Sequence, residues 1–141
     1  MKLKNGIQRS SFNEQLKDKW RTVFYIATAI IVMIGSLFAW WFGEDTAPMI
    51  FIGGICGLIG HWIATTVSSL KLPKSKRIII IDYLETHRYD RMSNGVKYVP
   101  KIHRLLRFDS QDVHLYFSGN DELEIRGAYY VLKKINQVCS A

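Results

Sequence analysis

The sequence predicts a membrane α-helical hairpin of two transmembrane helices, followed by a small cytosolic α+β domain with an antiparallel sheet and a C-terminal helix. Two long apolar runs without a charged residue follow one another closely in the first half of the 141-residue chain. Lys and Arg gather on both flanks of these runs, and the pattern then changes to strand-like alternation. A chain of this length has room for one small globular domain beside the membrane part.

Residues 1–21 are predicted to form a basic N-terminal arm or an interfacial helix. Residues 11–14 (SFNE) match the Ser-x-x-Glu capping box, which favours a helix start at that point. Phe12, Leu16 and Trp20 would then share one face of the helix and rest on the inner leaflet. A solvated extension of the first span is the alternative that this pattern leaves open.

Residues 22–42 and 48–70 are the predicted transmembrane helices, and residues 43–47 form the external turn between them. Neither run contains Asp, Glu, Lys or Arg. At a rise of ~1.5 Å per residue, about 20 residues span the ~30 Å hydrocarbon core of a bilayer. Pro48 suits the first turn of the second helix, with Thr46 as its N-cap.

The charges around the two runs predict their orientation. Residues 1–21 carry six Lys or Arg, four more lie between Lys71 and Arg77, and the connecting turn has none. The positive-inside rule therefore places both termini in the cytoplasm, with the hairpin in contact with membrane lipids. Cys56 and Cys139 lie far apart in this arrangement and are expected to be free thiols.

Pro73 is expected to end the second helix within a linker at residues 71–75, and residues 76–141 form the predicted cytosolic α+β domain. An Asn94-Gly95 hairpin turn lies within this region. A closing amphipathic helix is indicated by apolar residues at Val131, Ile135 and Val138. The predicted strands are Ile78–Tyr83, Val96–Val99, Leu105–Asp109, Val113–Phe117 and Leu123–Ile125.

Small residues recur along the predicted spans at steps of three or four residues. Gly53, Gly57 and Gly60 lie in the second run, and Gly35 begins a Gly-x-x-x-Ala motif in the first. Such spacing lets helix backbones approach closely. These glycines are predicted to pack the hairpin internally, or also to join copies of the chain into a homo-oligomer.

His61 is the only titratable side chain in the two runs besides one thiol and one phenol. An ionisable group inside a membrane is a candidate functional site, here for gating, pore lining or protonation. The structural alternative is a neutral imidazole that is hydrogen bonded to Thr28, Thr65 or Ser36.

The densest basic segment of the predicted cytosolic domain lies at residues 97–107, which contain four Lys or Arg and one histidine. Interleaved tyrosines could stack on bases while cations hold phosphates, so an anionic ligand is one interpretation. Attraction to anionic lipid headgroups, plain solubility and a protein partner are the others. The candidate ligand-binding residues are Arg88, Arg91, Lys97, Lys101, His103, Arg104 and Arg107.

Catalysis has little support in this sequence. The histidines lack metal-ligand spacing with any cysteine, and no phosphate-binding glycine loop or nucleophile elbow occurs. The chain is therefore expected not to be an enzyme and to have no catalytic residues, metal or cofactor.

The layout of two spans before a compact cytosolic domain resembles that of small bacterial antiviral membrane effectors, including the CRISPR-associated type. The resemblance implies oligomerisation, binding of a nucleotide messenger such as cyclic oligoadenylate rather than a nucleic-acid duplex, and disruption of the membrane. Residues 113–137 also resemble the end of bacterial PH-like domains, which fits a scaffold. An immunity protein against a pore-forming toxin and a non-enzymatic scaffold subunit of an inner-membrane complex are the alternative functions.

Overall fold

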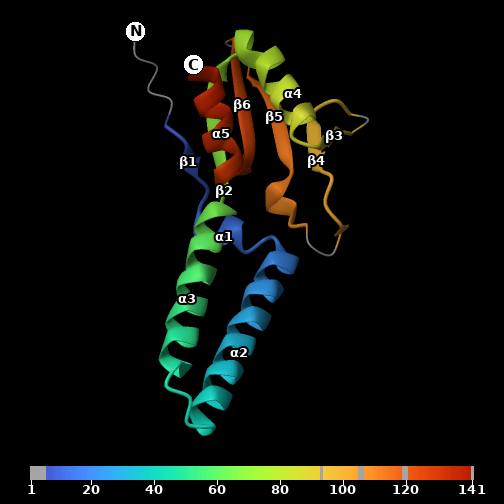
Figure 1. The fold of residues 1–141 in the computed structure, drawn as a ribbon. Coiled ribbons are helices and arrows are strands. Elements are labelled where there is room, and N and C mark those ends of the chain that lie inside the picture. Colours follow the sequence, from blue (N-terminus) through green and yellow to red (C-terminus); the bar gives the residue numbers. More distant parts are fainter. Residues whose placement is uncertain (1–5, 93, 105–106, 119–120, 141) are drawn as a thin grey trace.

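In the computed structural model, a hairpin of two long helices projects from one end of a two-layer globule (Figure 1). The structure describes residues 6–92, 94–104, 107–118 and 121–140. The elements are β1 (Gln8–Arg9), α1 (Phe12–Gln15), α2 (Lys19–Trp41), α3 (Ala47–Ala64), β2 (Val67–Pro73), the 3₁₀ turn η1 (Lys74–Lys76), α4 (Arg77–Thr86), β3 (Tyr89–Arg91), β4 (Lys97–Pro100), the 3₁₀ turn η3 (Asp109–Gln111), β5 (Val113–Ser118), β6 (Glu122–Ala128) and α5 (Tyr129–Ser140).

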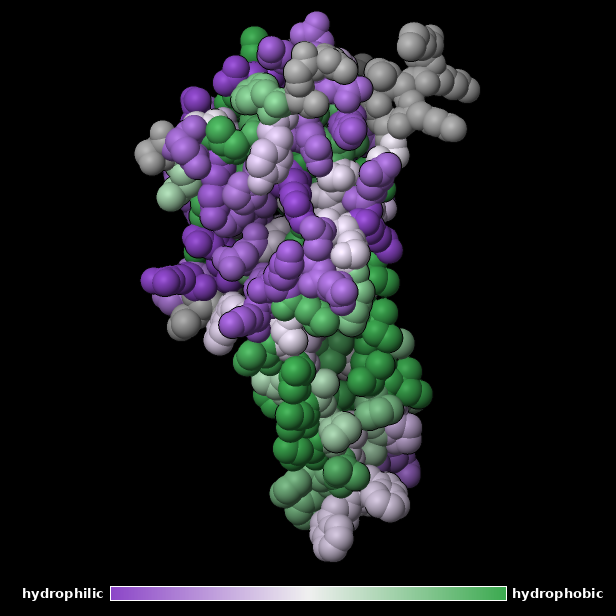
Figure 2. Space-filling view, turned by 180° about the vertical axis from the view of Figure 1, so that it is seen from behind, coloured by the Kyte–Doolittle hydropathy of each residue, from purple (hydrophilic) through white to green (hydrophobic). Residues whose placement is uncertain are grey.

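The helical hairpin has the two helices that the sequence predicts. Helices α2 and α3 are long and apolar enough to cross a membrane by length and composition. Figure 2 shows their surface as a continuous hydrophobic column below a hydrophilic globule. Thr46 occupies the N-cap position of α3 and Pro48 lies in its first turn, as predicted.

The predicted second helix is too long. Helix α3 ends at Ala64, and residues predicted as its last turn and as a linker form strand β2 instead. Ser68, Leu70 and Leu72 are buried on one face of this strand. These residues are apolar or uncharged because they lie in the core of the globule, and sequence alone does not distinguish that environment from lipid.

The sheet has six strands in the order β1-β2-β6-β5-β4-β3, and every neighbouring pair is antiparallel. Strand β1 comes from the predicted N-terminal arm, and Gln8 pairs with Ser69 of β2. The predicted interfacial helix is reduced to the four residues of α1. The globule is therefore built from both sides of the hairpin rather than from residues 76–141 alone.

Helices α4 and α5 cover one face of the sheet (Figure 1). The prediction of a strand at residues 78–83 is wrong, because this segment is helix α4. Ile80 and Leu84, four residues apart, are both 0% exposed, whereas Ile78 is exposed. An uninterrupted run of isoleucines hides this helical period. The pattern of β-branched residues therefore favoured a strand.

The other predictions for the globule have mixed outcomes. The Asn94-Gly95 turn joins β3 to β4, with Gly95 at a positive φ of 65°. Strands β5 and β6 and helix α5 are confirmed, although Cys139 is buried where Val138 was expected. Of the predicted strand at residues 105–109, Leu105 and Leu106 lie outside the described residues, and Asp109 begins η3.

The hairpin packs through a glycine that the sequence analysis did not select. A Cβ atom at Gly54 would lie 2.6 Å from Cγ1 of Val32 on α2. At Gly35, Gly53, Gly57 and Gly60 the same added atom meets no atom of the described residues within 4 Å. The prediction that these glycines pack the hairpin internally is therefore wrong, since the helical period turns them away from the contact made by Gly54.

A buried arginine ties the hairpin to the globule. Arg21, near the start of α2, is 0% exposed. Its Nη1 donates to the Thr65 carbonyl at 2.7 Å, and its Nη2 donates to the Gln15 carbonyl at 2.9 Å and to Gln15 Oε1 at 3.0 Å. Its guanidinium also lies over the ring of Trp62, 4.4 Å from the centroid.

Two further side chains complete this junction. Gln15 bonds the start of β2 twice, since its Nε2 donates to the Val67 carbonyl at 2.9 Å and its Oε1 accepts from Val67 N at 2.8 Å. Asp18 caps α2 by accepting from Arg21 N at 3.0 Å, and its other oxygen accepts from Ser110 N at 3.1 Å. We call Gln15, Asp18, Arg21 and Thr65 the collar.

We expect Arg21→Met to lower the free energy of unfolding by about 3 kcal/mol or more, because it leaves buried acceptors without donors at ~1–3 kcal/mol each. Thermal or denaturant unfolding in detergent micelles measures this loss. Lys19→Met, at an exposed position on the same helix turn, is the control and should change stability by less than about 0.5 kcal/mol. Equal stability of the two variants would contradict the structural role of Arg21.

Gly54→Ala should weaken the hairpin by about 1–3 kcal/mol, since its methyl group overlaps the stiff Val32 side chain and must push the helices apart. Gly53→Ala is the matched control, because its methyl group enters open space. A pair of labels on α2 and α3, read by electron paramagnetic resonance, should report a wider separation for Gly54→Ala only. The same separation in both variants would rule out this contact.

Candidate functional site

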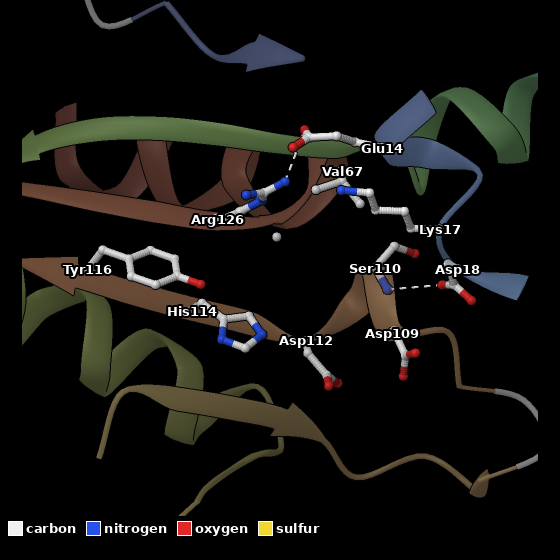
Figure 3. A pocket seen from close by; sticks show the side chains of 11 residues that line it. Glu14, Lys17, Asp18, Val67, Asp109, Ser110, Asp112, His114, Tyr116 and Arg126 are labelled. Carbon is white, nitrogen blue, oxygen red and sulfur yellow. Dashed lines mark hydrogen bonds and ion pairs between the residues drawn. The ribbon is translucent and has the colours of Figure 1, made fainter. Parts of the chain in front are cut away.

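A polar groove lies on the sheet face opposite α4 and α5. Along β5, Val113 and Leu115 point into the core, so His114 and Tyr116 face the other way. The groove has a volume of about 270 Å³. Figure 3 shows its lining, which comes from α1, the α1–α2 connection, β2, η3, β5 and β6: Glu14, Lys17, Asp18, Val67, Asp109, Ser110, Asp112, His114, Tyr116, Arg126 and Gly127.

Two acidic side chains in this groove already have partners within the protein. Glu14 pairs with Arg126 at 3.0 Å, and Asp18 accepts from Ser110 N (Figure 3). A hydrogen bond from Ser10, followed by the attraction of Arg126, lowers the pKa of Glu14. These two interactions hold α1 and the start of α2 against the sheet.

Asp112 explains two of the predicted ligand-binding residues. Its side chain is 1% exposed, and it lies 2.7 Å from Lys97 Nζ and 3.8 Å from Arg107 Nε. Burying a carboxylate is costly unless cations lie close to it. Lys97 thus stabilises the fold by pairing with Asp112, and the Arg107 guanidinium makes a longer ion pair with the same carboxylate.

The other predicted cations do not converge on one point. Lys101 pairs with Asp90 at 2.9 Å across the β3–β4 ladder. The Arg91 guanidinium lies beside Gly95 in the hairpin turn. His103 and Arg104 are exposed. The close spacing of basic residues along the chain predicted one anion site. In the fold, acidic partners separate these residues from one another.

A second pocket, of about 320 Å³, lies where the C-terminal end of α4 meets β3, β4 and the start of α5. Two of its residues, Arg88 and Lys101, belong to the predicted ligand-binding set. Its aromatic residues were not predicted from the sequence, because they come from segments that only the fold brings together. We call this the tyrosine pocket, lined by Tyr83, His87, Arg88, Tyr89, Pro100, Lys101, Ile102, Tyr130 and Val131.

Aromatic rings form much of the tyrosine pocket. Tyr83 and His87 stack with ring centroids 4.0 Å apart and an interplanar angle of 26°. Tyr89 and Tyr130 are hydrogen bonded through their side chains, and burial, with a smaller contribution from Tyr130, raises the pKa of Tyr89 well above its usual value. Tyr89 therefore stays neutral near pH 7 and presents a ring and a hydroxyl group rather than a negative charge.

The two cations of the tyrosine pocket are held by an unusual backbone. Arg88 has a φ of 62°, in the left-handed region that side chains other than glycine rarely adopt. Its carbonyl accepts a 2.8 Å hydrogen bond from Lys101 N, which fixes the two residues side by side. Strained backbone of this kind is often found where a side chain must be aimed at a ligand.

The tyrosine pocket is connected to the collar through one helix terminus. Tyr130 lines the pocket, and the adjacent Tyr129 donates its N–H to the Thr66 carbonyl at 2.9 Å. Thr66 directly follows Thr65, whose carbonyl accepts from Arg21. A displacement of the start of α5 would therefore act on the exit of the hairpin.

His61 is bonded inside the hairpin by a residue that was not predicted. The Tyr25 hydroxyl lies 2.5 Å from His61 Nδ1 and 3.1 Å from Thr65 Oγ1. The other predicted partners, Thr28 and Ser36, bond carbonyls of their own helix. The structure thus favours a structural hydrogen-bonding role for His61 near the collar.

The thiols and possible metal ligands add no further site. Cys56 is exposed on α3 and Cys139 is buried in α5, and both are free, as predicted. Within residues 6–92, 94–104, 107–118 and 121–140, no group of three or more His, Cys, Asp or Glu is placed to hold a metal ion. No protein-family model matches the chain, and neither a curated protein nor a solved structure matches it.

His114 predicts a pH dependence of stability. Burial, followed by repulsion from Lys97, lowers its pKa in the folded protein. As the pH falls below about 6.5, the unfolded chain binds the proton more readily, so the folded state loses stability. Between pH 7.5 and pH 5.5, the thermal midpoint should fall by a few degrees less in His114→Gln than in the unsubstituted protein.

His87→Gln, which changes an exposed histidine at the end of α4, is the control for this measurement. The difference between His114→Gln and His87→Gln shows which part of the pH dependence belongs to His114. An identical pH dependence in His114→Gln and the unsubstituted chain would show that His114 does not titrate against the fold.

Proposed function

We propose that this protein is a membrane-anchored, non-enzymatic receptor whose globule binds an anionic nucleotide in the tyrosine pocket and whose collar passes this event to the hairpin. The observation that carries the proposal is the position of α5, whose Tyr130 lines the pocket while Tyr129 bonds Thr66 at the exit of α3. The start of α5 thus contacts both the proposed ligand site and the end of the hairpin.

The chemistry of the pocket supports a nucleotide rather than a simple anion. Tyrosine and histidine rings offer stacking surfaces for a base, and such stacking contributes ~1–3 kcal/mol per base. Arg88 and Lys101 supply positive charges for phosphates, with the fork-shaped guanidinium suited to two phosphate oxygens. Cyclic oligoadenylate, the messenger implied by the resemblance described above, is the first ligand to test.

The output would be a change in how copies of the hairpin pack in the inner membrane. Gly53, Gly57 and Gly60 lie at four- and three-residue steps on α3 with open space above them. A face of this kind allows close approach of a second α3, and so a homo-oligomer. Binding shifts the assembly only if the ligand prefers one arrangement over the other. Disruption of the membrane in antiviral defence is the proposed consequence.

The test uses the full chain in nanodiscs and a titration with cyclic oligoadenylate. Arg88→Gln combined with Lys101→Gln should weaken binding by about tenfold or more, since charged hydrogen bonds contribute ~1.5–3 kcal/mol each. Tyr130→Phe should retain most of the affinity, because it keeps the ring, whereas Tyr130→Ala should lose it.

Lys133→Gln combined with Lys134→Gln is the matched control, since it removes the same charge from the exposed side of α5. It should bind like the unsubstituted protein. Failure of the unsubstituted protein to bind, or full affinity in the pocket double variant, would refute the proposed site.

A further inference from the structure

We infer that a separate hollow at the foot of the globule binds the headgroup of an anionic glycerophospholipid. The hollow has a volume of about 280 Å³ and is bordered by Trp20, Arg104, Arg107 and Asp109. This inference rests on the membrane anchoring proposed above, but it concerns different residues from those of the tyrosine pocket.

The hollow lies at the level where the apolar hairpin meets the polar globule. Trp20 is the second residue of α2, the first candidate span, and its side chain is 46% exposed. Figure 2 shows the surface changing from hydrophobic to hydrophilic where the hairpin enters the globule. Tryptophan is enriched at this depth, because its ring suits the headgroup region of a bilayer.

Two guanidinium groups supply the positive charge of the hollow. Arg107 N donates to the Arg104 carbonyl at 3.4 Å, which holds these two residues close together. Arg107 Nε is 3.8 Å from Asp112, which is longer than a hydrogen bond, so Asp112 holds this guanidinium only weakly. One guanidinium group can donate two parallel hydrogen bonds to two oxygens of a phosphate.

The composition of the hollow favours a lipid headgroup over a nucleotide. Trp20 is its only aromatic border among the described residues, and it stands at the membrane boundary rather than among stacking tyrosines. Lys17 and Lys19, both exposed beside Trp20 in sequence, add charge that attracts anionic lipids by about 1 kcal/mol each.

Asp109 refines the choice of lipid. A carboxylate repels a bare phosphate but accepts hydrogen bonds from hydroxyl groups. A headgroup with a phosphodiester and free hydroxyls, such as that of phosphatidylglycerol, satisfies both sides of the hollow. Its phosphate would lie on Arg104 and Arg107 and its glycerol hydroxyls on Asp109.

The experiment places the full chain in nanodiscs of phosphatidylcholine with a minor share of phosphatidylglycerol and counts retained lipids by native mass spectrometry. The unsubstituted protein should retain phosphatidylglycerol several-fold above its share in the bilayer. Arg104→Gln combined with Arg107→Gln should abolish this enrichment, whereas Lys133→Gln combined with Lys134→Gln should preserve it. Equal enrichment in all three proteins would overturn the inference.

Two further arms identify the source of the phosphate and separate this inference from the receptor proposal. Glycerol 1-phosphate is titrated into the detergent-solubilised protein, and its affinity should be at least tenfold lower than the affinity of phosphatidylglycerol. Equal affinities would show a site for free phosphates instead. In nanodiscs of phosphatidylcholine alone, where no phosphatidylglycerol occupies the hollow, cyclic oligoadenylate binding should be unchanged in the Arg104 and Arg107 double variant. Loss of nucleotide binding in this variant would show that the two sites are not separate and would overturn the inference.

Discussion

The rest of the structure depends on the burial of Arg21. A fully buried guanidinium is costly unless its donors are satisfied. Here Nη1 and Nη2 are satisfied by main-chain and side-chain oxygens of Gln15 and by the carbonyl of Thr65, the C-cap of α3, whereas Nε has no hydrogen-bond partner among the described residues. The carbonyls at a helix C-terminus lack intrahelical partners and carry partial negative charge, so a cation from α2 completes the end of α3. The two helices are thereby joined at the globule as well as at their distal turn.

This junction makes the hairpin and the globule one folding unit. Strand β1 precedes the hairpin in sequence and β2 follows it, yet Gln8 pairs with Ser69 in the same sheet. Gln15 extends this pairing, because its amide bonds both the N–H and the carbonyl of Val67 in the manner of a neighbouring strand. Strand β1 can therefore pair with β2 only when the ends of α2 and α3 next to the globule are together, and this pairing in turn holds them together.

The sequence correctly predicted those elements whose residue pattern is typical of only one kind of structure. The two apolar runs, the Asn94-Gly95 turn and the amphipathic α5 belong to this class. The end of α3 was not predictable, because uncharged residues suit a buried strand and a lipid-facing helix equally. The candidate site was predictable only in part: Arg88 and Lys101 were selected by charge, but Tyr83 and Tyr130 lie in segments that meet only in the fold. The role of Lys97 depends on Asp112, whose burial no sequence pattern reveals.

Each of the two proposed binding sites contains a residue that is close to the collar along the chain. Trp20, at the edge of the lipid hollow, immediately precedes Arg21 in α2. Tyr130, in the tyrosine pocket, follows Tyr129, which bonds Thr66 just beyond the Thr65 carbonyl that Arg21 holds. A ligand in either site that favours one arrangement of the collar must change the affinity of the other site by the same factor, because binding free energies are linked reciprocally. The membrane lipid would then set the threshold at which the nucleotide acts, and no contact between the two ligands is needed.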